Sequence, residues 1–287
     1  MLGGRDTTTA PSRGAPRGGA GGRAARRRAV AVLVGVALLV LALLVGLVVS
    51  VTGMFTSDDA STSDDGASVT TTDPGAAAGN GPQAESALAR RPMLALPESA
   101  SMPHALSSRS AGAAITVPQP GQVVGTLVPG GFPGTEEGAL GKVLAVTRAG
   151  LSGGDLQTWA QVYASVAEPG AAPPEQTPVS RDLAEFRRSA HMSPTGPRAG
   201  TTISWAPTSA MVKGTTDDGT YLVGCVLGEF VVEHEGRVVT GGYGNCLPMR
   251  RVGDQWRIAS GPAAAAAPSP WPGSDEAVAA GYRELQQ

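Results

Sequence analysis

Aromatic and charged side chains are scarce in this 287-residue chain. Aromatic residues make up 4% of it and charged residues 16%, whereas it holds 40 glycines and 23 prolines. Such a composition supplies too few core-forming side chains for one large globule that fills the whole length. A soluble cytoplasmic enzyme that occupies the entire chain is therefore excluded.

Histidine and cysteine are rarer still, which limits metal and redox chemistry. The three histidines, His104, His191 and His234, do not stand beside a second ligand at metal-binding spacing. The sequence has no CxxC motif, nucleophile elbow, phosphate loop or dinucleotide fingerprint. We therefore expect no catalytic residues, no metal site and no cofactor, and the protein is not predicted to be an enzyme.

Charge is distributed unevenly along the chain. Residues 1–28 carry seven arginines against Asp6, residues 29–51 carry no charge, and residues 52–287 hold 15 basic and 23 acidic side chains. The region able to fold is thus acidic, which argues against nucleic-acid binding. We expect the basic tail 1–28 to be disordered and cytoplasmic, because it cannot bury apolar surface.

The uncharged stretch 29–51 predicts a membrane anchor. Its 23 residues, AVAVLVGVALLVLALLVGLVVSV, are long enough to span a bilayer as a helix. The arginines before it place the amino terminus in the cytoplasm and residues 52–287 outside. A cleaved signal peptide fits poorly, because its apolar region is shorter and ends in a small-residue cleavage site. We expect a single-pass protein of the cell membrane with an extracytoplasmic carboxy-terminal domain.

Residues 52–132 predict a low-complexity extracytoplasmic tether, because Ser, Thr, Asp, Ala, Gly and Pro dominate them. Short apolar pieces cut by proline interrupt this tether. Exposed apolar side chains need a cover, so these pieces and one tryptophan beyond the domain are candidate partner-binding residues. They are Met93, Leu94, Leu96, Ile115, Val117 and Trp271.

Regular patterns fill residues 133–261. Thr135, Asp155 and Thr177 are helix-capping residues, each followed by apolar residues at helical spacing. Four strand-like segments follow Gly200, separated by Asp-Gly, Glu-Gly and Gly-Asp turns. The predicted fold class is α+β, with three amino-terminal helices packed on a curved four-stranded antiparallel sheet. Residues 262–287 form an Ala/Pro tail with a short carboxy-terminal helix, which either hooks a partner or folds back on the sheet.

The turn at Glu235-Gly236 fixes a register. If these residues form a two-residue loop, the numbers of paired residues sum to 471, and Cys225 lies directly opposite Cys246 at a non-hydrogen-bonded pair. The same register collects apolar side chains on one face of the sheet. The sequence therefore predicts a Cys225–Cys246 disulfide, as an exported location permits.

The order of three helices, a curved antiparallel sheet and a closing strand GDQWRIASGP resembles the nuclear-transport-factor-two-like (cystatin-like) cone fold. With the basic tail and membrane helix, the chain resembles bitopic VirB-eight/TcpC-like components of conjugation (type IV secretion) machines. The segments RRPMLALP, VPGGFPGTEEGAL and WPGSDEAVAAGYRE are similar to actinobacterial proteins of that kind.

The resemblance implies a non-catalytic, membrane-anchored scaffold of a conjugative transfer or type IV secretion channel. Its partners would be other channel proteins or further copies of itself, as a homo-oligomer. The alternative is an extracytoplasmic small-ligand-binding or hydrolytic sensor that uses the pocket of the cone. A buried Asp–His or Asp–Tyr pair would favour this alternative.

Overall fold

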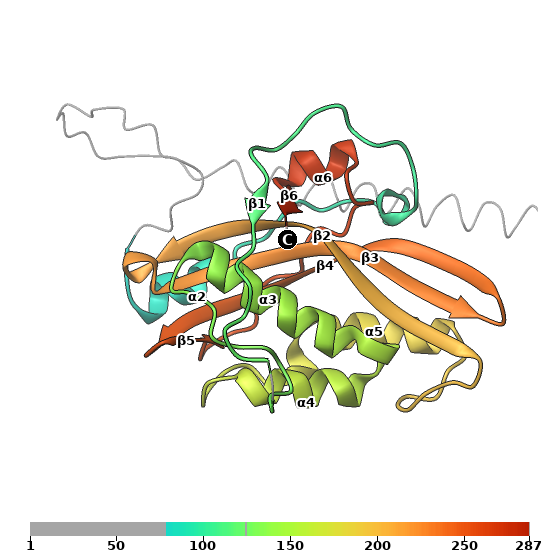
Figure 1. Ribbon diagram of the computed structural model, residues 1–287, viewed down its shortest axis with the longest axis horizontal. Helices are drawn as coiled ribbons and strands as arrows, with labels where there is room; N and C mark the ends of the chain where they lie inside the picture. The colour runs from blue at the N-terminus through green and yellow to red at the C-terminus, as the bar shows by residue number, and fades with distance from the viewer. Residues whose placement is uncertain (1–78, 124, 287) are drawn as a thin grey trace, which may run out of the picture. The chain divides into compact units, whose positions relative to one another are not determined.

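A computed structural model of the chain describes residues 79–123 and 125–286, which form a six-stranded sheet with helices on both faces (Figure 1). The helices are α2 (Pro82–Arg90), α3 (Glu136–Leu151), α4 (Leu156–Val166), α5 (Pro178–Ser189) and α6 (Asp275–Ala280). Short 3-10 turns are η1 (Glu98–Ser101), η2 (Ser152–Gly154), η3 (Pro174–Gln176) and η4 (Asp217–Gly219). The strands are β1 (Ile115–Thr116), β2 (Thr201–Thr216), β3 (Tyr221–His234), β4 (Arg237–Val252), β5 (Gln255–Ile258) and β6 (Arg283–Gln286).

The strand order is β1-β6-β2-β3-β4-β5, and the sheet is mixed. Strands β2 to β5 form an antiparallel meander, β6 pairs antiparallel with β2, and β1 pairs parallel with β6. The predicted fold class, a cystatin-like cone with a four-stranded antiparallel sheet, is therefore wrong. The two extra strands have only two and four residues, too few to show an alternating pattern, and they lie in segments interpreted as tether and tail.

Helices α3, α4 and α5 cover one face of the sheet. Their N-caps are Thr135, Asp155 and Thr177, and each side chain accepts a hydrogen bond from a backbone N–H of the first turn. The apolar stripes of these helices meet the inward side chains of the meander in a first core. This core includes Leu140, Val143, Trp159, Val162, Tyr163, Leu183, Leu222, Val226, Leu247, Met249 and Ile258.

The opposite face of the sheet is also buried. Helices α2 and α6 and the segments around them cover it, building a second core that includes Leu88, Ala89, Met211, Tyr221, Val223, Leu227, Ala277 and Tyr282. The first eight residues of β3, YLVGCVLG, are all buried. A continuous apolar run of this kind is typical of a strand covered on both faces. The predicted fold, with helices on one face of the sheet, did not take this into account.

Residues 79–132, apart from residue 124, belong to this fold and do not form a solvated tether. Leu88 and Ala89 of α2 enter the second core, while Ile115, Val128 and Phe132 enter the first. The tail after residue 261 folds back on the sheet through α6 and β6. In the described ranges 79–123 and 125–286, no helix is long and apolar enough to cross a membrane. The predicted cytoplasmic tail 1–28, membrane helix 29–51 and tether residues 52–78 lie outside the described residues.

The β3–β4 register agrees with the prediction at every paired position, from His234 opposite Arg237 to Tyr221 opposite Arg250. Cys225 and Cys246 are joined, with their Sγ atoms 2.01 Å and their Cα atoms 4.1 Å apart. Met93 packs against this bond, its Sδ atom 3.5 Å from the Sγ of Cys246. The β2–β3 register shifts between Pro207 and Ser209 and again between Val212 and Gly214.

Candidate functional site: the open end of the β2–β4 ribbon

One end of the three-stranded ribbon β2–β4 extends beyond the second core. The side chains on that face change there from buried to accessible: Leu227 is buried, Glu229 and Val231 are half-buried, and Glu233 is exposed. At the same end, none of the strands that the structure describes lies on the outer side of β4, because β5 pairs only with Met249–Val252. The hairpin tip is therefore open along one edge.

The backbone of β4 presents free hydrogen-bonding groups at this edge. Cys225 and Cys246 are a non-hydrogen-bonded pair, so every second residue of β4 counted from Cys246 directs its N–H and C=O away from β3. Val238 and Thr240 are two of these residues. The outward N–H and C=O groups of these two residues form no backbone hydrogen bond with residues 79–123 or 125–286. An unpaired edge of this kind is a template for another strand.

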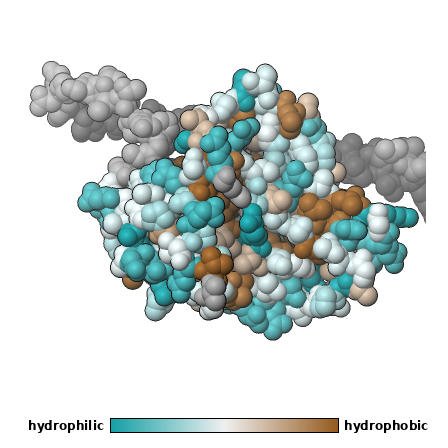
Figure 2. All heavy atoms as spheres, viewed as in Figure 1, coloured by the Kyte–Doolittle hydropathy of each residue, from teal (hydrophilic) through white to brown (hydrophobic). Residues whose placement is uncertain are grey.

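Apolar side chains flank the same edge on both faces of the sheet. Val238 is 63% exposed and Val239 is 64% exposed, on opposite faces. Nearby, η1 packs against β4 so that the carbonyl of Ser101 lies close to Gly241, and the next residue, Met102, is 53% exposed. Figure 2 shows a hydrophobic patch over this end of the ribbon, above α5 as placed in Figure 1. The edge thus combines free main-chain groups with accessible apolar area.

The helix-covered side of the ribbon end carries an aromatic cluster. Phe186 of α5 meets Phe230 edge-on, with ring centroids 5.3 Å apart, and Phe230 lies 6.0 Å from Tyr243. The Tyr243 hydroxyl donates to Asp182 at 3.0 Å. Burial, together with the nearby Asp182 charge, raises the pKa of Tyr243 well above its ordinary value.

This Asp–Tyr pair does not form an enclosed catalytic site. Partial desolvation raises the pKa of Asp182, whose side chain remains exposed to solvent. In an enclosed catalytic pocket, both the acid or base and the residue that it is hydrogen-bonded to would be shielded from water. The pair joins α5 to β4 at the surface. In the described part of the chain, no group of three or more His, Cys, Asp or Glu side chains could hold a metal ion.

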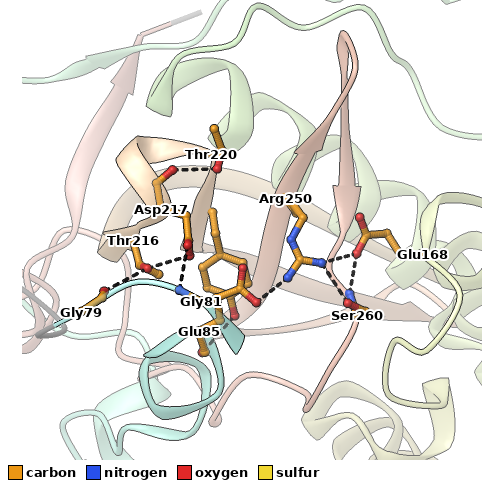
Figure 3. Close-up of polar contacts among 10 residues, drawn as sticks. Gly79, Gly81, Glu85, Glu168, Thr216, Asp217, Thr220, Arg250 and Ser260 are labelled. Carbon is orange, nitrogen blue, oxygen red and sulfur yellow. Dashed lines mark hydrogen bonds and ion pairs between the residues drawn. The ribbon is translucent and has the colours of Figure 1, made fainter. Parts of the chain in front are cut away.

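The most elaborate polar cluster fastens α2 to the sheet and does not surround a cavity (Figure 3). Arg250 of β4 lies between Glu85 of α2 and Glu168 and forms an ion pair with each. Its Nη1 atom lies 2.6 Å from the Oε2 atom of Glu168. Its guanidinium also stacks over the ring of Tyr221, 5.6 Å from the centroid. The Ser260 amide donates to the same Glu168 carboxylate at 2.7 Å. Every charge in this cluster is paired, so its role is to hold the segments together.

A second set of hydrogen bonds in Figure 3 fixes the start of α2. The Gly81 amide donates to Asp217 at 2.7 Å, and the Thr216 hydroxyl donates to the same carboxylate at 2.7 Å. These bonds lower the pKa of Asp217, the bond from Thr216 being the larger cause. Residues 79–85 are thereby attached to the turn between β2 and β3.

The six candidate partner-binding residues lie mostly against their own domain. Ile115 is buried and pairs with Leu285, and the Val117 amide donates to Gln286. Met93, Leu96 and Trp271 are half-buried, and Leu94 is 47% exposed. What covers most of these side chains is the domain itself. The structure brings them to different places and does not gather them into one surface.

Sequence reasoning missed the accessible valines, Val238 and Val239. Two consecutive β-branched residues next to a turn must lie on opposite faces of a strand, and only one of the two could enter the predicted core.

The chain matches no protein-family model, no curated protein and no solved structure.

Proposed function

We propose that this protein is a non-catalytic assembly component whose folded domain binds neighbouring proteins through the open edge of β4. In this proposal, residues 29–51 anchor the chain in the cell membrane and the domain lies outside the cell membrane. The assembly is the channel of a conjugative transfer or type IV secretion machine, as the resemblance noted above suggests.

The single observation that carries the binding role is the unpaired edge at Val238–Thr240. A partner strand laid along this edge gains main-chain hydrogen bonds from the outward-facing N–H and C=O groups. Val238 and Val239 would then contact alternate side chains of the partner strand. Burial of both valines contributes on the order of 2 kcal/mol each, which is enough to dominate a small interface.

The rigidity of the ribbon supports the same role. The Cys225–Cys246 bond joins β3 and β4 within the second core. Trp205 reaches across Gly228, and its indole Nε1 donates to the Tyr243 carbonyl at 3.0 Å, which ties β2 to β4. A preformed edge binds with less loss of conformational entropy than a flexible one.

The experiment compares two aspartate variants of the full-length protein in its native host. Val238→Asp/Val239→Asp places charge on both faces of the open edge, whereas Val252→Asp changes a valine that is 45% exposed at the far end of the same strand. Detergent extracts are run on native gels, and transfer frequency is counted. The double variant should leave the high-mass complex and lower transfer by about tenfold or more, whereas Val252→Asp should behave as wild type.

Both variants should unfold at nearly the wild-type temperature, because the substituted side chains are accessible. Normal complexes and normal transfer in the double variant would refute the binding role of the edge. A wild-type protein that migrates as a single chain, or a deletion strain that transfers normally, would refute the assembly role.

A further inference from the structure

A half-open cavity of about 460 Å³ lies on the other side of the domain, between α3, the end of α4, β5 and the loop before α3. This loop closes on itself through hydrogen bonds between Gln122 and Gly130, of 2.9 and 2.8 Å. The lining residues are Gln122, Thr126, Leu127, Val128, Gly130, Lys142, Ser165, Val166, Gln255, Trp256 and Arg257. The cavity uses no residue of the open β4 edge.

Two cations and no acid line this cavity. Lys142 of α3 is only 5% exposed, and its Nζ donates to the Pro129 carbonyl at 2.9 Å. An ammonium group has three donors, so this bond leaves donors on Nζ for a ligand. Arg257 of β5 is exposed at the mouth of the cavity. Neither side chain forms an ion pair with any acidic side chain of the described residues.

The positive charge at this place is costly without a counter-ion. Burial, with a smaller effect of the nearby Arg257 charge, lowers the pKa of Lys142 to about 8, so the amine is still mostly protonated at neutral pH. Arg251 pairs with Trp256 in the β4–β5 ladder, and its buried Nη1 has no hydrogen-bond partner in the part of the chain that the structure describes. A buried ammonium group that no carboxylate accompanies indicates a site whose negative partner comes from outside the domain.

The other residues that line the cavity indicate which chemical groups a ligand would carry besides its negative charge. Trp256 and Val166 supply an apolar wall, while Gln122, Gln255 and Thr126 supply hydrogen-bonding groups. A cavity of this volume and mixed lining is typical of sites for small molecules. We propose that the cavity binds a small organic anion, with a carboxylate or phosphate head on Lys142 and Arg257 and a compact apolar body against Trp256. This site is independent of the assembly role.

Calorimetric titration of the full-length protein in a non-ionic detergent tests the proposal. The probes are phenyl phosphate and benzoate, which separate the two head groups, and the neutral benzyl alcohol as the matched control. At least one anion should bind saturably below about 10 mM, a range that calorimetry reaches. Benzyl alcohol should give no saturable heat.

Variants then locate the site. Arg257→Gln removes an exposed cation of the cavity and should weaken anion binding by about tenfold, the loss expected for a charge-assisted hydrogen bond. Lys142→Met should weaken it at least as much. Arg148→Gln removes an exposed cation of the same helix outside the lining and should leave binding unchanged.

Three results would overturn the proposal. The first is that neither anion binds the wild-type protein. The second is that Arg257→Gln binds as wild type, a result that stands even if Lys142→Met does not fold. The third is equal weakening by Arg257→Gln and Arg148→Gln, since attraction to the overall charge would then explain the binding.

Discussion

Replacing Arg250 with methionine should strongly destabilise the domain. Arg250, Glu85 and Glu168 have side chains that are 24%, 10% and 12% exposed. The substitution leaves two poorly solvated carboxylates without a cation. Removing one partner of a buried ionic cluster costs about 3–5 kcal/mol. In a domain of this size each kcal/mol lowers the melting temperature by about 2–4 °C, so the expected fall is roughly 6–20 °C.

Tryptophan fluorescence during thermal unfolding of the full-length protein is a suitable assay, because Trp159, Trp205, Trp256 and Trp271 are the only tryptophans and all lie in the domain. Arg188→Met is the matched control. It breaks an ion pair with Glu185 whose side chains are 70% and 67% exposed, and such surface pairs contribute about 1 kcal/mol or less.

A third variant separates the lost charge pairing from lost packing. In Arg250→Met/Glu85→Gln/Glu168→Gln the carboxylates are neutral, so most of the melting temperature should return. The reasoning is wrong if Arg250→Met melts within about 2 °C of wild type, or if the triple variant melts as low as the single one. If residues 79–132 were a solvated tether, Glu85 would not contact Arg250. Replacing Arg250 would then leave no unpaired carboxylate at Glu85.

Other predictions concern the disulfide, a carboxylate and a glycine. Cys225→Ala/Cys246→Ala should cost less than the roughly 3 kcal/mol assigned to a loop of this size, because the strands are already paired; denaturant titration measures this cost, and free thiols in unreduced wild-type protein would contradict the bond. Hydrogen bonds lower the pKa of Asp217, so the stability it provides is present above its unfolded pKa of about 4 and lost as pH falls through the lower folded value. Acid unfolding curves below about pH 4 should therefore be steeper for wild type than for Asp217→Asn, and identical curves would refute the linkage. Gly242→Ala should cost on the order of 1–3 kcal/mol, because its Cβ would lie 1.9 Å from the Pro270 carbonyl, whereas Gly241→Ala meets nothing closer than 3.6 Å and should melt as wild type; equal melting temperatures would refute this close approach.

The central meander was predictable because several independent patterns agree. The Glu235-Gly236 turn, the alternation of apolar residues and the spacing of Cys225 and Cys246 all require one register. Helix starts at Thr135 and Asp155 were equally clear, since a capping side chain immediately precedes an apolar period. In these segments local sequence and tertiary packing favour the same conformation.

The second layer was not predicted because its elements are short and lie in segments of low-complexity composition. α2 has nine residues with proline in its first turn, a helix-start pattern that the surrounding Gly and Ala residues obscured. The sequence predicts the carboxy-terminal helix over residues 275–285, but α6 stops at Ala280, where Gly281 adopts φ 95°, and the chain then forms β6. The edge valines were missed for another reason, because exposure depends on where the covering segments end.

The position of β6 has a consequence for biosynthesis. It lies between β1 and β2, so Ile115 cannot pair until Leu285 has been made, 170 positions later. A ribosome can therefore release a complete meander while the strand at residues 115–116 still has no neighbour. Contacts this distant in sequence also slow folding, because a long loop must close before they form. A premature stop at position 283, which removes β6 and the residue after it, should thus disturb the chain near residue 115. A partly made chain likewise exposes the apolar side chains that β6 covers until that strand is in place.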